Sequence, residues 1–254
     1  MRYFVEFAYN GTTFHGSQRQ PNGITVQEVM EDAFFTIMRE KVALTFAGRT
    51  DAGVHAEQMF AHFDTTQTLP NCLQDRLNSL LPSTIALCRI IPVTDDAHAR
   101  FSALARTYEY RITTDKEPFK QDLVTRVAPG LDFEAMNRAA ALLLGKHDFA
   151  SFCKVHTDVK TTFCDVTRAE WSVLRQQSGL CSVSEAVFSI TADRFLRNMV
   201  RAVVGTLFEV GKKKMTPKDF LGVIESRNRC VAGQSAPAQG LYLTHIQYPD
   251  TIYL

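Results

Sequence analysis

The sequence predicts an α+β fold in two units, each combining helices with a largely antiparallel sheet. In the first hundred residues, strand and helix patterns follow the order β-α-β-β-α-β, which is the split βαβ arrangement of ferredoxin-like units. The later part again mixes strands, a hairpin and helices, and we describe both parts as ferredoxin-like or RRM-like units. With 254 residues, 45% of them apolar and 22% charged, the chain suits one large domain or two modest ones. We place the boundary near residue 101, which gives domains 1–101 and 102–254.

Local signals predict each element of the first domain. Thr25 can cap a helix, because Glu28 three residues later completes a capping box. The apolar residues that follow recur at helical spacing and form one buried face: Val26, Val29, Met30, Ala33, Phe34, Ile37 and Met38. The other elements of this domain are expected as strands at 2–9, 42–47, 58–64 and 84–93, and as a helix from Pro70 with Leu73, Leu77, Leu80 and Leu81 directed inward.

The second domain has similar signals. Asp132 can cap a helix that runs to Leu144 and stops at Gly145, a residue typical of helix ends. The other elements are expected as a strand at 105–114, a hairpin of 166–175 and 180–190 around a turn at 176–179, a long helix at 193–210, a helix starting at Thr216 and Pro217, and a strand at 241–248.

Composition and missing motifs exclude several kinds of protein. The formal net charge is only +1, which argues weakly against a nucleic-acid binder, although an even balance can hide a basic face. No two of the six cysteines lie within four residues and the seven histidines show no regular spacing, so we expect no metal. We find no phosphate-cradling loop, dinucleotide fingerprint or serine elbow. No signal peptide and no membrane-spanning apolar run is present, so we expect a cytoplasmic protein without a membrane partner.

The segment from Ala47 to Ala56, AGRTDAGVHA, is the first that could carry chemistry. It is polar, it lies between two expected strands, and its glycines permit backbone shapes that other residues resist. A carboxylate fixed on a rigid loop at a strand end, here Asp51, is well placed to act as a nucleophile. The same residues are also typical of an Asx turn, in which Asp51 only binds the backbone.

The expected helix at 193–210 carries a basic stripe. At 100° per residue, one narrow row contains Arg194, Arg197, Asn198, Arg201 and Gly205. Three arginines in a row suit a phosphate backbone, and a glycine in the row leaves room for close approach. A run of three lysines that starts at Lys212 extends this positive surface. The alternatives are an ordinary solvated helix face and a favourable contact of the lysines with the helix dipole.

The segment HARFSALARTYEY, from His98 to Tyr110, interleaves basic and aromatic residues. Its members of these types are Arg100, Phe101, Arg106, Tyr108 and Tyr110. Aromatic rings and guanidinium planes together are how proteins hold splayed single-stranded bases. The alternative for Tyr108 and Tyr110 is one half-buried face of a strand.

These residues resemble a known family, the TruA-type tRNA pseudouridine synthases. AGRTDAGVHA is similar to the catalytic motif of that family. The similarity continues through HARFSALARTYEY, through FLRNMVRAVVG from Phe195 to Gly205, and through APAQGLYL from Ala236 to Leu243. Gln18-Arg19-Gln20 matches a further family element, although the family often has Gly-Trp before it and this chain has Gly16-Ser17. After the catalytic motif, the usual Gly-Gln-Val run is replaced by Gln58-Met59-Phe60.

The resemblance implies an isomerase that converts uridine to pseudouridine at positions 38–40 of the tRNA anticodon arm. It also implies two domains around a central basic cleft, a homodimer, and no cofactor or metal. Asp51 matches the catalytic aspartate and Tyr108 matches the tyrosine that contacts the target base. The resemblance further assigns active-site positions to Arg49, Arg201 and Leu241, and tRNA binding to the stretch containing His98, Arg100 and Phe101. Arg197 and Lys212 are predicted RNA contacts on the basic surface.

The reaction suits these residue types. Uracil leaves the ribose, turns and rejoins through carbon 5, so nothing is oxidised and no cofactor is required. Asp51 could attack the ribose, attack the base or remove a sugar proton, and a nearby arginine would keep it ionised. The uridine must leave its stack to reach a carboxylate, and Tyr108 could then stack on it. Two other functions fit part of the pattern: a non-catalytic RNA-binding protein, and a phosphate-ester hydrolase with an aspartate nucleophile.

Overall fold

The computed structural model describes residues 1–154, 160–176 and 183–254. These residues form helices and largely antiparallel strands, which confirms the mixed class predicted from the sequence. The chain divides into two compact units, of which unit 1 contains residues 1–106 and 243–254 and unit 2 contains residues 107–242. The division therefore falls after Arg106 rather than near residue 101, and the C-terminal residues belong to the first unit instead of the second.

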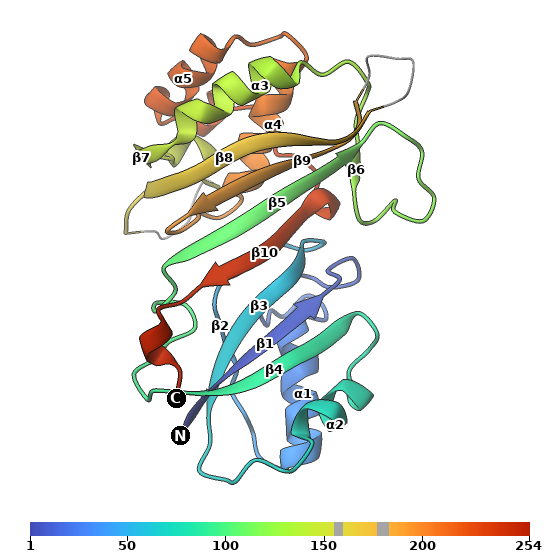
Figure 1. The fold of residues 1–254 in the computed structure, drawn as a ribbon, viewed down its shortest axis with the longest axis vertical. Helices are drawn as coiled ribbons and strands as arrows, with labels where there is room; N and C mark the ends of the chain where they lie inside the picture. Colours follow the sequence, from blue (N-terminus) through green and yellow to red (C-terminus); the bar gives the residue numbers. More distant parts are fainter. Residues whose placement is uncertain (155–159, 177–182) are drawn as a thin grey trace. The chain divides into compact units, whose positions relative to one another are not determined.

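Unit 1 has an antiparallel sheet with two helices on one of its faces (Figure 1). Its central pair is β1 (Arg2–Tyr9) and β3 (His55–Asp64), with Phe4 opposite His62 and Tyr9 opposite Ala56. The other strands are β4 (Ile85–Val93) beside β1, the short β2 (Thr45–Phe46) beside β3, and β10 (Leu241–Gln247), whose later residues continue beside β3.

The two helices of unit 1 begin where local signals place them or slightly later. In α1 (Val26–Met38), the Glu28 N–H donates to the Thr25 hydroxyl at 3.3 Å, which confirms the predicted N-cap. Helix α2 (Leu73–Leu80) buries Leu73 and Leu77. Leu80 is 51% exposed, so the prediction that it points inward is wrong, because the helix ends there and has only two turns.

The antiparallel strands of unit 2 lie in the order β5-β9-β8-β7, with the helices of this unit on one face (Figure 1). The strands are β5 (Ala105–Thr113), β7 (Gly145–Asp148), β8 (Phe163–Gln176) and β9 (Val183–Ala192), and the short β6 (Thr125–Arg126) pairs with β5 in parallel. The predicted hairpin is present as β8 and β9, and most of its turn lies outside the described residues.

Three helices cover this sheet: α3 (Phe133–Ala140), α4 (Met199–Gly211) and α5 (Pro217–Ser226). The core between them centres on Trp171 of β8, whose ring lies 5.3 Å from the ring of Phe188 and 5.9 Å from that of Phe208. The Asp132 carboxylate caps α3, accepting from Ala135 N at 2.9 Å, and Thr216 forms a full capping box with Asp219 at α5. The cap at Asp132 confirms the prediction, whereas at Thr216 only the start of the helix was predicted.

The expected helix at 193–210 starts later than predicted. The backbone of Asp193 is held by Asp165, since Asp193 N donates to the carbonyl of Asp165 at 3.1 Å. Asn198 then takes a left-handed conformation with φ of 64°, and its side-chain amide donates to Ser235 Oγ at 2.7 Å. These distant partners stop the helix from forming before Met199. The predicted basic stripe is therefore wrong as a single helical row, because Arg194 and Arg197 precede the helix.

Gly205 also has a different role from the one predicted. A Cβ at this position would lie 1.8 Å from the carbonyl oxygen of Gln234, so the glycine lets the chain's own backbone pack against α4. Gly233 N donates to Thr206 Oγ1 at 2.9 Å and continues the same contact. The space beside Gly205 is therefore filled by the segment that precedes β10, and it is not left open for RNA.

We expect Gly205→Ala to destabilise the protein by about 1–3 kcal/mol, because the added methyl must push the segment around Gln234 away from α4. The matched control is Gly222→Ala in α5, where a Cβ meets nothing within 4 Å. That change should stabilise the protein by about 0.5–1 kcal/mol, since alanine favours helix more than glycine does. Urea denaturation measures both, and an unchanged free energy of unfolding for Gly205→Ala would contradict this account.

Candidate functional site

Asp51 lies on a short loop between β2 and β3 in unit 1. The carbonyl of Asp51 accepts from Val54 N at 3.2 Å, and Gly53 has a φ of 75°, so the loop turns sharply into β3. Asp51 is half-buried, and Arg49 on the same loop is exposed. Arg49 Nε donates to the side chain of Gln18. The structure thus places the predicted carboxylate and arginine on one tightly turned loop.

The residues after β1 pack directly against this loop. Gly11 N donates to His55 Nδ1 at 3.0 Å, and a Cβ on Gly11 would lie 2.0 Å from the carbonyl oxygen of Val54. The hydroxyl groups of Tyr9 and Thr50 are 2.8 Å apart. The Asp51 loop is therefore supported by backbone as well as by side chains, and sequence analysis did not identify His55 or Tyr9 as part of this support.

The predicted RNA-binding residues of unit 1 form a second loop, after β4. Phe101 is 75% exposed, the Arg100 guanidinium lies 5.5 Å from the centre of its ring, and the His98 ring lies 4.5 Å from it. Ala99, which lies between His98 and Arg100, has both of its backbone groups bound. Its N–H donates to His62 Nδ1 at 3.2 Å and its carbonyl accepts from the Tyr248 hydroxyl. The loop therefore presents an aromatic ring and a cation from a rigid backbone.

His62 is buried beneath this loop, next to Arg2 and Asp64. Burial lowers the pKa of His62 to about 4, and the nearby positive charges of His98 and Arg2 act in the same direction. Burial also lowers the pKa of His98. A neutral imidazole is required here, since His62 Nδ1 must accept the hydrogen bond from Ala99.

Two of the predicted residues of unit 2 lie on or near β5. Tyr108 is half-buried, and its ring meets the ring of Phe195 edge-on at 4.9 Å. Tyr110 is fully buried; its hydroxyl lies 2.6 Å from Thr125 Oγ1 and donates to the carbonyl of Pro237 at 2.9 Å. Burial raises the pKa of Tyr110. Tyr110 is therefore a core residue, and Tyr108 is the one of the pair with surface left for a ligand.

Arg201 holds the segment that leads to Leu241. Its Nε donates to the carbonyl of Ala236 at 2.8 Å, and its own carbonyl accepts from Ala236 N at 2.8 Å. Arg201 is half-buried and Leu241 is 6% exposed. The structure thus connects two predicted site residues, Arg201 and Leu241, through one short stretch of backbone.

The remaining predicted cations differ in their surroundings. Arg197 is exposed, and its carbonyl accepts from Lys154 N at 3.0 Å. Lys212 is exposed but lies 3.0 Å from the Glu209 carboxylate, which is also 3.7 Å from Lys214. These contacts lower the pKa of Glu209, the hydrogen bond from Lys212 most of all. The lysine run after α4 is thus partly neutralised, which weakens the positive surface expected there.

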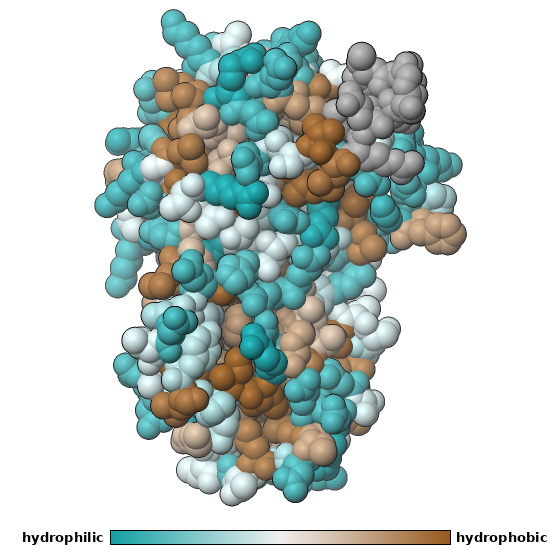
Figure 2. All heavy atoms as spheres, in the orientation of Figure 1, coloured by the Kyte–Doolittle hydropathy of each residue, from teal (hydrophilic) through white to brown (hydrophobic). Residues whose placement is uncertain are grey.

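A cavity of about 590 Å³ lies on the sheet of unit 2, away from these residues. Most of its charged groups pair with one another, since Arg111 lies 2.8 Å from Glu109 and Lys120 lies 3.1 Å from Glu185. Neither Tyr108 nor the predicted cations line it. On the face shown in Figure 2, hydrophilic and hydrophobic residues are interspersed over both units. This cavity is therefore not the predicted RNA surface.

Within the described ranges, no cluster of three or more histidine, cysteine, aspartate or glutamate residues could hold a metal ion. Over the same residues, no helix is both long and apolar enough to cross a membrane.

Comparison with known proteins finds consistent relatives. Residues 139–249 match a family model described as tRNA pseudouridine synthase. A protein of Porphyromonas gingivalis named tRNA pseudouridine synthase A is 52% identical, over all of this chain and 99% of that protein. Proteins of the same name from Bacteroides thetaiotaomicron and Parabacteroides distasonis are 50% and 49% identical over 99% of this chain, and the matches cover 92% and 98% of those proteins.

The contact between His62 and Ala99 predicts a pH dependence of stability. Because the pKa of His62 is lower in the folded protein than its ordinary value of 6.5, the unfolded chain binds the proton more readily. The contribution of neutral His62 to the free energy of unfolding is therefore fully present above pH 6.5. It is lost as the pH decreases from 6.5 to about 4. We expect His62→Asn, which keeps an acceptor near Ala99 and cannot titrate, to reduce this slope. Denaturation midpoints measured across that range test it, and an equal slope in both proteins would refute the assignment.

Proposed function

Because the chain belongs to the tRNA pseudouridine synthase A family, we propose that it isomerises uridine to pseudouridine in tRNA, at positions 38–40 of the anticodon arm. The observation that carries the proposal is the fixed loop that presents Asp51 and Arg49 together. A pure RNA-binding protein would use the exposed Phe101 and Arg100 but would have no need of a carboxylate held on a sharply turned loop. Uracil is detached from the ribose and then rejoined through carbon 5, and these two steps together require no oxidant and no cofactor.

We assign the roles of the residues as follows. Asp51 is the catalytic carboxylate, acting on the ribose or the base of a uridine that has left its stack. Tyr108 stacks on that base, and Arg49 and Arg201 stabilise the charge that develops on it. Leu241, which is buried at the start of β10, forms an apolar wall that helps to exclude water from the detached sugar.

The RNA contacts follow from exposure. Phe101 and Arg100 supply a ring and a cation on a rigid loop, a combination that suits an unpaired base and its phosphate. The His98 ring packs against the ring of Phe101. Arg197 adds an exposed positive charge on unit 2, and Lys212 a weaker one because of its contact with Glu209.

Several finer features belong to the same proposal. The strand order β4-β1-β3, with β2 on the other side of β3, supports a ferredoxin-like unit 1. We further propose that the two units contribute to one basic cleft, that two copies of the chain form a homodimer, and that the protein acts in the cytoplasm. Footprinting of bound tRNA tests the cleft, and measurement of molecular size in solution tests the homodimer.

We expect Asp51→Asn to lower kcat for pseudouridine formation at least about a thousandfold and to leave the Kd for tRNA within about twofold, because only the ionised carboxylate is lost. Unmodified tRNA is incubated with each purified protein without additives, and pseudouridine is then mapped along its sequence. Product at positions 38–40 with the wild type alone supports the proposal. Full activity of Asp51→Asn would refute the role of Asp51, and tRNA binding without any product would favour the RNA-binding alternative.

We expect Arg197→Gln to weaken tRNA binding and to make it less dependent on salt, with a decrease of roughly 0.7–0.9 in the slope of log K against log salt for one lost phosphate contact. The control is Arg138→Gln, which removes another exposed charge, one that lies 3.9 Å from Glu134 on α3. The slope for Arg138→Gln should remain that of the wild type. An unchanged slope for Arg197→Gln would exclude a phosphate contact.

A further inference from the structure

The segment Gly16–Gln18 contacts the residues before Asp51 one after another. Ser17 N donates to the carbonyl of Thr50 at 3.3 Å, and Thr50 N donates to Ser17 Oγ at 2.9 Å. Gln18 accepts a hydrogen bond from Arg49 Nε. Both backbone groups of the residue next to Asp51 are therefore bound by a single residue, Ser17.

Ser17 is fully buried, with 0% of its surface exposed. Besides accepting from Thr50 N, its hydroxyl donates to the carbonyl of Gly48 in a long hydrogen bond of 3.5 Å. A hydroxyl can donate and accept at once, which a methyl group of the same size cannot do. Loss of this hydroxyl would leave the partly buried backbone N–H of Thr50 without its acceptor, a defect that favours movement of the loop.

The close approach of the two segments depends on Gly16. Its φ is 94°, in the left-handed region, and a Cβ there would lie 2.8 Å from the carbonyl oxygen of Thr50. Ser17 can therefore reach Thr50 with both its backbone and its side chain. The contact is specific to this pair of segments and is not a general consequence of a polar loop.

Helix α1 anchors the Gly16–Gln18 segment. Val26 N donates to the carbonyl of Gly16 at 3.3 Å, and Gln27 N donates to the carbonyl of Ser17 at 3.0 Å. The segment thus supplies acceptors to the first turn of α1, where backbone N–H groups have no partner within the helix. Movement of Ser17 is restrained from the helix side as well as from the loop side.

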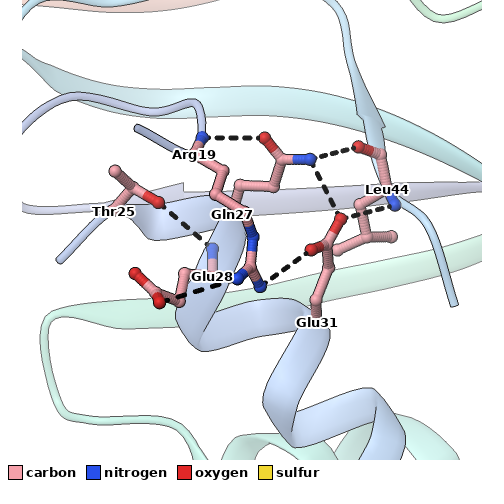
Figure 3. Close-up of polar contacts among 6 residues, drawn as sticks. All are labelled: Arg19, Thr25, Gln27, Glu28, Glu31 and Leu44. Atoms are coloured by element: carbon pink, nitrogen blue, oxygen red, sulfur yellow. Dashed lines mark hydrogen bonds and ion pairs between the residues drawn. The ribbon is translucent and has the colours of Figure 1, made fainter. Parts of the chain in front are cut away.

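The same helix also holds the strand that leads into the Asp51 loop (Figure 3). The Gln27 side chain accepts from Arg19 N at 3.0 Å and donates to the carbonyl of Leu44 at 3.1 Å. Glu31 accepts from Leu44 N at 3.0 Å, and it lies 3.2 Å from the Arg19 guanidinium. One helix face therefore fixes both the Gly16–Gln18 segment, through Arg19, and the backbone just before β2, through Leu44.

We propose that Ser17 is a positioning residue for the reaction, whose hydroxyl fixes the backbone of Thr50 and thereby the direction in which Asp51 presents its carboxylate. This inference rests on the proposed role of Asp51 and extends it to a residue that the family resemblance does not assign. The family often has tryptophan at this place, and an indole N–H can only donate. Thr50 N therefore obtains from Ser17 an acceptor that a tryptophan side chain could not supply.

The test compares Ser17→Ala with the wild type in single-turnover and steady-state reactions on unmodified tRNA. We expect kcat to fall about 10- to 100-fold while the Kd for tRNA stays within about twofold, because a small misplacement of a reacting group slows the chemical step. Amide hydrogen exchange at Thr50 should become at least about tenfold faster, since its N–H loses its acceptor. Ser17→Cys retains a weak acceptor, so its kcat and its exchange rate at Thr50 should lie between those of the wild type and Ser17→Ala. Ser17→Cys replaces Ser17→Ala if that variant does not fold.

The matched control is Ser151→Ala in unit 2. Ser151 is also 0% exposed, its hydroxyl donates to the carbonyl of Val223 at 2.6 Å, and it accepts from Asn228 N at 2.9 Å. Ser151→Ala should lower the stability but leave kcat unchanged. A kcat for Ser17→Ala within twofold of the wild type, or an equal loss of kcat in both variants, would overturn the proposal.

Asp51→Asn, measured in parallel, separates this inference from the proposed function. If Asp51→Asn is inactive and Ser17→Ala is normal, Ser17 has no positioning role and the function stands. If Asp51→Asn is active, the role of Asp51 fails, and with it the basis for assigning Ser17.

Discussion

The antiparallel register of β1 against β3 is the constraint on which the Asp51 loop and its support depend. Tyr9 at the end of β1 lies opposite Ala56 near the start of β3, so the residues after one strand run beside those before the other. This is why Gly11 can reach His55. Because side chains alternate along a strand, a slip of one residue would send each buried side chain to the opposite face and separate the two loops. The register of β1 against β3 therefore determines where the Asp51 loop lies relative to the residues that support it.

The sequence predicted best those features that depend on neighbouring residues. The caps at Thr25 and Asp132 each involve a partner three residues away, which a local pattern can reveal. The placement of the Asp51 loop between two strands was predicted in the same way. For Asp51 and Tyr108, in contrast, single segments left a structural alternative open, and the resemblance of four ordered motifs decided in favour of chemistry.

Features that depend on distant partners were not predictable. The late start of α4 is caused by bonds from Asp193 to Asp165 and from Asn198 to Ser235, which no periodicity reveals. Gly205 looked like an opening in a basic stripe because the segment that fills it follows almost thirty residues later, at Gln234. The only sequence signal for Ser17 was a departure from the usual Gly-Trp pattern, and its partner became visible only in three dimensions.

The division of the chain has a consequence for its synthesis. Unit 1 is discontinuous, since unit 2 is inserted between Arg106 and Leu243. The last strand of unit 1 supplies Ile246, whose N–H donates to Gln58 at 2.9 Å, and it is followed by Tyr248, which binds Ala99. A ribosome completes every residue of unit 2 before it makes these two. Unit 1, which carries Asp51, therefore cannot be completed until all of unit 2 has been translated, although most of unit 1 is translated first.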